Sequence, residues 1–263
     1  MTTRSPRIIA ALTVMTCAAA CTAAPSASPS SGSSSRPSSR SSAGSSVVAA
    51  SGAPSLHPLP SASSFVDVID NPWMPWPVGT TWRFIGRSAQ GTERTVVTVT
   101  DRKRVVDGVR ATVVRDVVHV DGRLLEDTDD WYAQDSDGNV WYLGEDTKEY
   151  DRSGKANTYG SWEAGVNGAK PGIVMLARPV PGASYRQEYL RGQAEDQAKV
   201  LGFHGSATVP VGHLHGLLRT YESSRLEPKA DEDKYYERGV GVVLEQSLHE
   251  KDRTELVSMT PAP

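Results

Sequence analysis

The chain is poor in cysteine and in the short motifs that mark common enzyme classes. Its two cysteines are Cys17 and Cys21, so the chain beyond residue 21 cannot form an internal disulfide. It has no Gly-x-Ser-x-Gly elbow, no His-Glu-x-x-His helix and no phosphate-binding glycine loop. The sequence therefore gives no support to a serine or cysteine hydrolase, a zinc protease or a nucleotide-binding protein.

The N-terminal apolar run, residues 8–20, is too short to span a bilayer and has the layout of a signal sequence. Two arginines precede it, and small residues lead directly to Cys21, as in a lipobox whose cysteine is lipidated and becomes the new N-terminus. Cys17 is a second candidate for processing, and ordinary cleavage after the alanine-rich segment is the alternative to lipidation. Residues 1–21 thus predict an exported protein, anchored to a cell membrane by lipid on Cys21 and lying on the extracytoplasmic side.

Residues 22–64 lack any periodic apolar pattern and consist largely of serine, alanine, proline and glycine. Such a segment cannot bury enough surface to offset its ordering entropy, which predicts a disordered tether. Residues 1–64 contain four arginines and no acid, so the remaining chain carries 24 basic and 31 acidic residues. This acidity argues against nucleic acid as a partner and leaves membrane contact to the N-terminal lipid.

Residues 65–258 lack a convincing helical stripe, apart from a weak one at 191–199, and are rich in strand patterns. Asp107-Gly108 and Asp121-Gly122 are typical two-residue hairpin turns. We expect one all-β domain, an antiparallel meander forming a barrel or curved half-barrel with few or no helices, followed by a tail at 259–263. The expected strands cover residues 80–87, 94–100, 104–106, 109–120, 123–134, 184–190, 195–201, 207–211, 217–223, 234–238, 242–248 and 253–257.

Two segments leave alternatives open. Residues 173–177 lie between prolines and would form either a strand or a short plug, because periodicity does not distinguish the two. Residues 71–79 contain three prolines, which forbid a helix there, together with two tryptophans. This segment would either seal the first strand against the core or form an aromatic lip on a ligand cavity.

The stretch 131–151 concentrates aromatic and acidic residues around one turn, 135–138, which carries a strong hairpin signal. With Gly138 as the bulge residue, Tyr132 faces Tyr142 and Ala133 faces Trp141. Side-chain alternation then places Trp131 and Trp141 on one face and Tyr132 and Tyr142 on the other. These four aromatic residues are candidates for stacking a small ligand, and the alternative is that they belong to the core.

The same pairing places Asp129 opposite Glu145, where two like charges must be neutralised or must bind a cation. A divalent cation is the cofactor that such a pair would hold. An EF-hand is excluded because the glycine comes fourth where that loop requires it sixth. A solvated or arginine-paired acidic hairpin end is the alternative.

Three histidines suggest a second metal site. His213 and His215 would project from the same side of a strand, and His204 lies close upstream. The alternative is an exposed turn at residues 212–216 with solvated histidines.

Glu188 belongs to a second hairpin in which polar residues alternate with aromatic ones. If both hairpins face inward, they form an acidic, aromatic-lined pocket for a cationic or sugar-like molecule. If they face outward, they are surface. Glu188 and Glu163 would also suit the acid/base chemistry of a glycosidase.

Several motifs together resemble a group of uncharacterised exported bacterial lipoproteins. They are Asn71-Pro72 with Gly79-Thr80, the run 130–135, the run 138–142, and Lys234-Tyr235-Tyr236 with Gly239-Val240-Gly241. The last motif is distantly similar to one in lipoprotein-carrier half-barrel domains. The resemblance implies the fold and no reaction.

The sequence leaves three functional hypotheses. The first is a lipid-anchored module that binds a small ligand or cation in a β-rich pocket. The second is a scaffold that meets another envelope protein through its aromatic edge, and the third is a hydrolase that uses a carboxylate pair.

Overall fold

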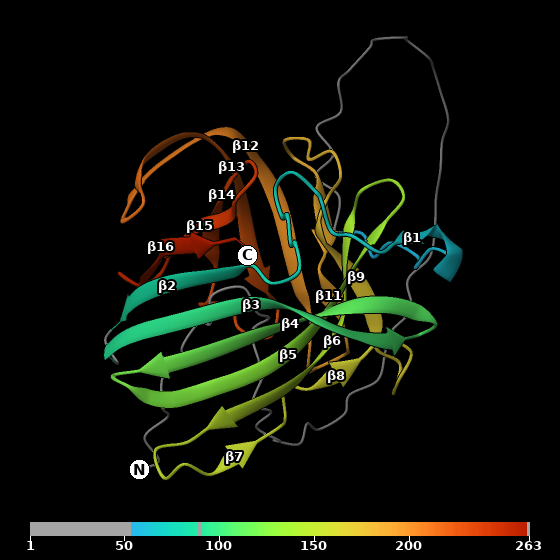
Figure 1. The fold of residues 1–263 in the computed structure, drawn as a ribbon, viewed down its shortest axis with the longest axis horizontal. Coiled ribbons are helices and arrows are strands. Elements are labelled where there is room, and N and C mark those ends of the chain that lie inside the picture. Colours follow the sequence, from blue (N-terminus) through green and yellow to red (C-terminus); the bar gives the residue numbers. More distant parts are fainter. Residues whose placement is uncertain (1–53, 89–90, 262–263) are drawn as a thin grey trace, which may run out of the picture.

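The computed structural model describes residues 54–88 and 91–261, and strands make up most of this part of the chain (Figure 1). A single turn of 3-10 helix, Ala62–Ser64, precedes the first strand. The strands are β1 Phe65–Val66, β2 Thr81–Ser88, β3 Gly91–Val106, β4 Val109–Val120, β5 Arg123–Asp135, β6 Val140–Tyr150, β7 Ala156–Asn157, β8 Trp162–Glu163, β9 Lys170–Met175, β10 Ser184–Arg186, β11 Glu188–Tyr189, β12 Asp196–Val209, β13 Gly212–Ser224, β14 Glu232–Glu237, β15 Gly241–Ser247 and β16 Arg253–Thr260.

The strands form one antiparallel sheet that curls into a nearly closed barrel. Consecutive strands pair from β2 to β6 and from β12 to β16, and β16 then pairs with β2. At the other junction, β10 pairs with β12 and β11 pairs with β9. Gln187 alone separates β10 from β11, so the two rows of strands meet at this residue. The expected all-β meander with barrel curvature is confirmed.

Tight turns connect the long strands as the sequence predicts. Asp107 and Gly108 both have positive φ, 47° and 81°, and so do Asp121 and Gly122, 49° and 81°. Both residues of a type I′ turn need this conformation, and its twist matches that of the flanking strands. These turns fix the registers of β3 with β4 and of β4 with β5.

Some elements differ from the expectation. The two segments expected at 94–106 are one strand, β3, with an irregularity between Val99 and Lys103. The two expected at 195–211 are likewise one strand, β12, because bulges near Gly202 and Gly205 bend the chain without ending its pairing. The weak helical pattern at 191–199 does not correspond to a helix, because these residues form a turn and the start of β12. Of the ambiguous segment 173–177, residues 173–175 belong to a strand, β9, which pairs with β6.

One end of the barrel is closed by residues 69–79. The Trp76 ring lies edge-on against Tyr132, with ring centroids 4.4 Å apart. The backbone N–H groups of Asp70 and Asn71 donate to the side-chain oxygen of Gln134. Together with the burial of Trp76, these contacts agree with a plug that seals the core.

The N-terminal predictions, including Cys17, Cys21, the signal sequence and most of the tether, lie outside the described residues. Within the described part, Ser55 forms a parallel bridge to Tyr185. Residues 54–88 and 91–261 contain no helix that is long and apolar enough to cross a membrane.

Candidate functional site

The central hairpin, β5 with β6, has the expected turn and the expected aromatic register. Asp135 and Asn139 close the turn, and the Gly138 N–H donates to the Asp135 carbonyl over 2.9 Å. Tyr132 then faces Tyr142 and Ala133 faces Trp141, both as predicted. The predicted register of the hairpin is therefore correct from the turn as far as Tyr132.

Beyond Tyr132 the register shifts by one residue, and the predicted pairing of Asp129 with Glu145 is wrong. Asp130 faces Glu145, and Asp129 faces Asp146. The extra residue is in β6, where Gly144 has a φ of 132°. A Cβ at this glycine would lie 2.3 Å from the Trp162 carbonyl oxygen, so β8 can approach only a glycine.

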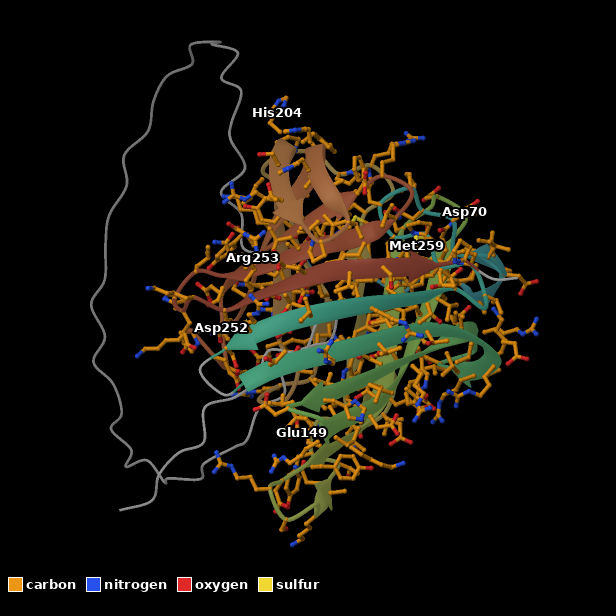
Figure 2. The ribbon with its side chains drawn as sticks, turned by 60° about the vertical axis from the view of Figure 1, so that its left-hand side comes forward. Asp70, Glu149, His204, Asp252, Arg253 and Met259 are labelled. Atoms are coloured by element: carbon orange, nitrogen blue, oxygen red, sulfur yellow. The ribbon has the colours of Figure 1, made fainter. Side chains whose placement is uncertain are left out.

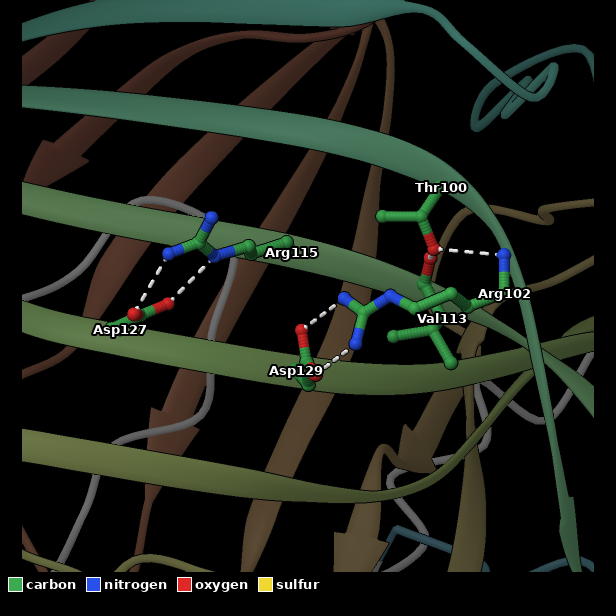
Figure 3. A network of polar contacts seen from close by, with 6 residues as sticks. All are labelled: Thr100, Arg102, Val113, Arg115, Asp127 and Asp129. Atoms are coloured by element: carbon green, nitrogen blue, oxygen red, sulfur yellow. Dashed lines mark hydrogen bonds and ion pairs between the residues drawn. The ribbon is translucent and has the colours of Figure 1, made fainter.

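Asp129 lies on the outer face of the barrel, opposite to Tyr132 and Asp130 by the alternation of β5, and the guanidinium of Arg102 binds both of its carboxylate oxygens over 2.6 Å (Figure 3). Arg115 binds Asp127 in the same way over 2.8 Å. These pairs line a groove of about 630 Å³ over β3 to β6. Asp129 is thus the arginine-paired surface acid that the alternative interpretation described.

The two tryptophan candidates are separated from the two tyrosine candidates by the sheet. Arg104 stacks 3.9 Å from the centre of the Trp131 ring. The Trp141 indole N–H donates to the carboxylate of Asp135 over 2.8 Å. Both tryptophans are buried, and these contacts tie Trp131 to β3 and Trp141 to the end of β5.

The opposite face of the sheet lines the barrel interior, which contains many buried acids. They come from most of the long strands and alternate with outward-facing residues, as the two-residue period of a strand requires. The members with less than a tenth of their surface exposed are Glu93, Asp116, Asp130, Glu145, Glu188, Asp196, Glu222, Glu232 and Glu245.

Asp130, Glu145 and Glu188 form one group within this interior, beside the stacked rings of Tyr132 and Tyr142. The Tyr142 hydroxyl donates to Asp130 over 2.7 Å. Neither carboxylate oxygen of Glu145 accepts a hydrogen bond from any residue that the structure describes, although Glu145 is only 1% exposed. We call Asp130, Glu145 and Glu188 the carboxylate triad.

The surroundings raise the pKa of each member of the triad well above its usual range. Burial is the largest cause for Glu145, and the charges of Asp130 and Glu188 add to it. Burial also dominates for Asp130, whose pKa the hydrogen bond from Tyr142 partly lowers. For Glu188, burial and the charge of Asp196 raise the pKa, against a smaller lowering by hydrogen bonds. Burial therefore favours the protonated form of all three carboxyl groups, and a cation bound among them would favour the charged form.

A second group in the interior contains its own cation, Lys234 on β14. Its ammonium nitrogen lies 3.3 Å from Glu222, 3.2 Å from Glu232 and 3.4 Å from Glu245. The Tyr236 hydroxyl donates to Glu222 over 3.0 Å. The charges of these carboxylates keep the pKa of Lys234 well above its usual range even though burial alone lowers it. The Lys234 ammonium thus offsets one negative charge of this group, and burial raises the pKa of Glu232 to about 8 and that of Glu245 to about 7.

The end of the barrel opposite the plug has a small opening. Glu93, Glu232 and Glu245 line it from the inside, and Asp252 and Arg253 lie at its rim (Figure 2). Its volume is about 20 Å³, which is room for a water molecule or one small cationic group. A drug-sized ligand, whose sites commonly measure about 300–1,000 Å³, does not fit this opening as it stands.

The histidine candidates lie away from the interior. His213 and His215 are exposed near the tip of the β12–β13 hairpin, and the His213 ring makes a hydrogen bond of 2.9 Å with Thr208. His204 projects from the bent part of the same hairpin (Figure 2). Within residues 54–88 and 91–261, no three histidine, cysteine, aspartate or glutamate side chains form a group that would hold a metal ion.

Comparisons with known proteins add one finding. No protein-family model matches the chain, and a comparison with curated proteins gives no match. The chain is similar to the crystal structure of a putative lipoprotein from Parabacteroides distasonis ATCC 8503. The two are 13% identical, the match covers 72% of this chain and 98% of the other, and the TM-score is 0.37.

Sequence reasoning selected Glu145 and Glu188 but missed Asp130 and Lys234. It paired Glu145 with Asp129 in place of Asp130, because it did not foresee the bulge in β6, for which Gly144 was the available signal. Lys234 lies in an alternating run, Glu232-x-Lys234-x-Tyr236, whose polar members all point inward. The alternation could be read from the sequence, but which of the two alternating sets faces the interior could not.

Glu163 and Glu188 do not form the carboxylate pair that a hydrolase would need. Glu163 binds Arg104 over 2.6 Å on the side of the sheet where Arg104 covers Trp131. Its neighbour Trp162 points the other way and packs edge-on against Tyr142 at 5.3 Å. Because successive residues of β8 face opposite sides, Glu163 lies across the sheet from Glu188.

Proposed function

We propose that this chain is an exported protein, anchored by lipid on Cys21, whose barrel interior binds a small cation through the carboxylate triad. The observation that carries the proposal is Glu145, a fully buried carboxyl group without a hydrogen-bond partner in the described chain. A buried polar group in that condition costs about 1–3 kcal/mol, and more if it is charged. A bound cation would remove that cost.

The second acidic group supports the same conclusion. There the carboxylates of Glu222, Glu232 and Glu245 surround the ammonium of Lys234. The triad also has three carboxyl groups, but within the described residues no side chain donates a hydrogen bond to Glu145, and the nearby charges that act most strongly on it are those of other acids. Lys234 therefore supplies one positive charge to its group, although both oxygens of Glu245 there also lack a hydrogen-bond partner in the described chain.

The test is thermal unfolding of the full-length protein in mild detergent, followed by tryptophan fluorescence with a series of metal chlorides and ammonium salts. We expect at least one cation to raise the melting temperature, and Glu145→Gln to abolish the increase. Asp129→Asn is the matched control, because this acid is one residue from Asp130 and lies on the outer face. If no cation stabilises the protein, or if both variants respond like the wild type, the proposal is wrong.

The anchor has its own test. Cells would be labelled with an alkyne-bearing fatty acid, and the labelled protein would be compared for Cys21→Ser and Cys17→Ser. Loss of label in Cys21→Ser alone would support lipidation there. Loss of label in Cys17→Ser alone would place the lipidation site at Cys17. A wild-type protein without label would refute the anchor.

A further inference from the structure

Resting on the proposed function, we propose that the cation is the primary ammonium group of a slender aliphatic amine, which enters at the rim opening and is held between Asp130, Glu145 and Glu188. The partner is thus a small organic amine and not a metal ion. Four features of the interior carry this choice.

The first feature is the way in which the barrel already holds an ammonium. The Lys234 nitrogen lies 3.2 to 3.4 Å from oxygens of three different carboxylates, on β13, β14 and β15. An ammonium has three donors and can satisfy three such acceptors at once. The triad likewise draws its carboxylates from three strands, β5, β6 and β11.

The second feature is the spacing of the carboxylates. Oxygen ligands lie about 2.0–2.6 Å from magnesium or calcium, so a metal requires its ligands to crowd together. No three acidic or histidine side chains in the described part of the chain are grouped in this way. An ammonium with oxygens about 3 Å away accepts wider spacing, as the distances at Lys234 illustrate.

The third feature is the aromatic wall beside the triad. The rings of Tyr132 and Tyr142 stack with centroids 4.7 Å apart, and Trp162 meets Tyr142 edge-on at 5.3 Å. Ring faces attract ammonium groups and pack well against methylene chains. A hydrated metal ion gains much less from such a wall, because it keeps its water or oxygen ligands.

The fourth feature is the route. The plug of residues 69–79 closes one end, and the opening of about 20 Å³ lies at the other, lined by Glu93 and Glu245. Asp116 lies between this opening and the triad along β4, since Glu93 pairs with Val120 and Asp130 pairs with Val114. A line of acids therefore leads inward, and the narrow opening favours a chain only one methylene wide.

Nothing about the acids alone would justify a site, because buried carboxyls can simply hold protons. The evidence for a ligand is Glu145. Its side chain is fully buried, has no hydrogen-bond partner in the described residues and faces Asp130 across the two strands. A ligand bearing three N–H donors supplies what this carboxylate lacks.

The experiment measures binding to the full-length protein in mild detergent, by calorimetry and by thermal unfolding, with three probes. These are n-butylammonium, tetramethylammonium and calcium, each as the chloride. The first two carry the same charge, but only n-butylammonium has N–H donors. We expect n-butylammonium to bind and the other two to bind at least about tenfold more weakly. We also expect binding to strengthen with rising pH, because the carboxyl groups must release protons.

The variants are Glu145→Gln, Asp130→Asn and the outer-face control Asp129→Asn. We expect the first two to weaken n-butylammonium binding by about tenfold or more and the control to leave it unchanged. Asp130→Asn keeps the experiment decisive if Glu145→Gln fails to fold.

The outcomes separate the two proposals. If calcium binds and Glu145→Gln abolishes its binding, a cation site exists but the ammonium assignment is wrong. If tetramethylammonium binds as tightly as n-butylammonium, the role of the N–H donors is refuted. If none of the probes binds, or if Asp129→Asn has the same effect as Glu145→Gln, the ammonium assignment falls. The broader cation series then decides whether the proposed function falls with it.

Discussion

Replacing Glu93 with glutamine should change how the stability of the protein depends on pH. Glu93 is 4% exposed and lies inside the rim opening. The Thr95 hydroxyl donates to it over 3.2 Å. Gly86 leaves space for it, since a Cβ at position 86 would lie 3.2 Å from the Glu93 Cβ. A glutamine fits the same space, accepts the same hydrogen bond and carries no charge at any pH.

Burial raises the pKa of Glu93 from 4.5 to about 7, with smaller contributions from nearby acids and an opposing one from Thr95. Between these two values the folded chain keeps a proton that the unfolded chain has lost. The stabilisation from this carboxyl is therefore complete below the unfolded pKa and disappears as the pH rises through the folded pKa. At about 1.4 kcal/mol for each pKa unit, the change amounts to about 3 kcal/mol.

The assay is urea denaturation of wild type and Glu93→Gln from about pH 4.5 to about pH 8. The wild-type free energy of unfolding should fall relative to that of the variant by about 3 kcal/mol as the pH rises across this window. Asp137→Asn, in the exposed turn between β5 and β6, serves as the acid-to-amide control and should follow the wild type. If Glu93→Gln follows the wild type as well, Glu93 does not titrate in this way and the reasoning is refuted.

Three further variants test other parts of the fold by urea denaturation. Gly144→Ala should destabilise the protein by about 3 kcal/mol, because its Cβ would meet the Trp162 carbonyl oxygen; a change within error would mean that the bulge tolerates a side chain. Asp129→Asn should cost about 1 kcal/mol or less, since its partner Arg102 is half exposed; a much larger loss would contradict a surface role. Glu145→Leu should stabilise the cation-free protein by about 1–3 kcal/mol at about pH 8, by removing a buried carboxyl; a loss of stability would show that Glu145 has a structural partner.

The sequence predicts the local parts of this fold well, because turns depend on a few residues. Asp107-Gly108 and Asp121-Gly122 form the expected turns, and β4 occupies the predicted range, residues 109–120. The aromatic pairing of Tyr132 with Tyr142 also follows from the turn next to it. In each case the residues that determine the geometry are adjacent in the chain.

The acidic interior could not be predicted, because a strand pattern gives the period and not the side that faces inward. On β14, Glu232, Lys234 and Tyr236 alternate with Asp233 and Tyr235, and both sets contain an acid and a tyrosine. Hydrophobicity therefore cannot choose the buried set. The choice depends on pairing with β13 and β15, which brings Glu222 and Glu245 to Lys234.

The position of the triad shows how much depends on one residue. Without the bulge at Gly144, Glu145 would pair with Asp129 and point outward with it, because a shift of one residue in β6 exchanges the faces of the residues beyond the bulge. Asp130 points inward in either case, since it shares the face of Tyr132 on β5. In the structure, Asp129 binds Arg102 on the outer surface, and Asp130 accepts a hydrogen bond from the Tyr142 hydroxyl inside the barrel. Burying Asp130 beside Glu145 costs stability, since the charge of Asp130 raises the pKa of Glu145 and no described side chain donates a hydrogen bond to Glu145. A bulge that places these acids together is what a binding site requires and what a purely structural hairpin would avoid.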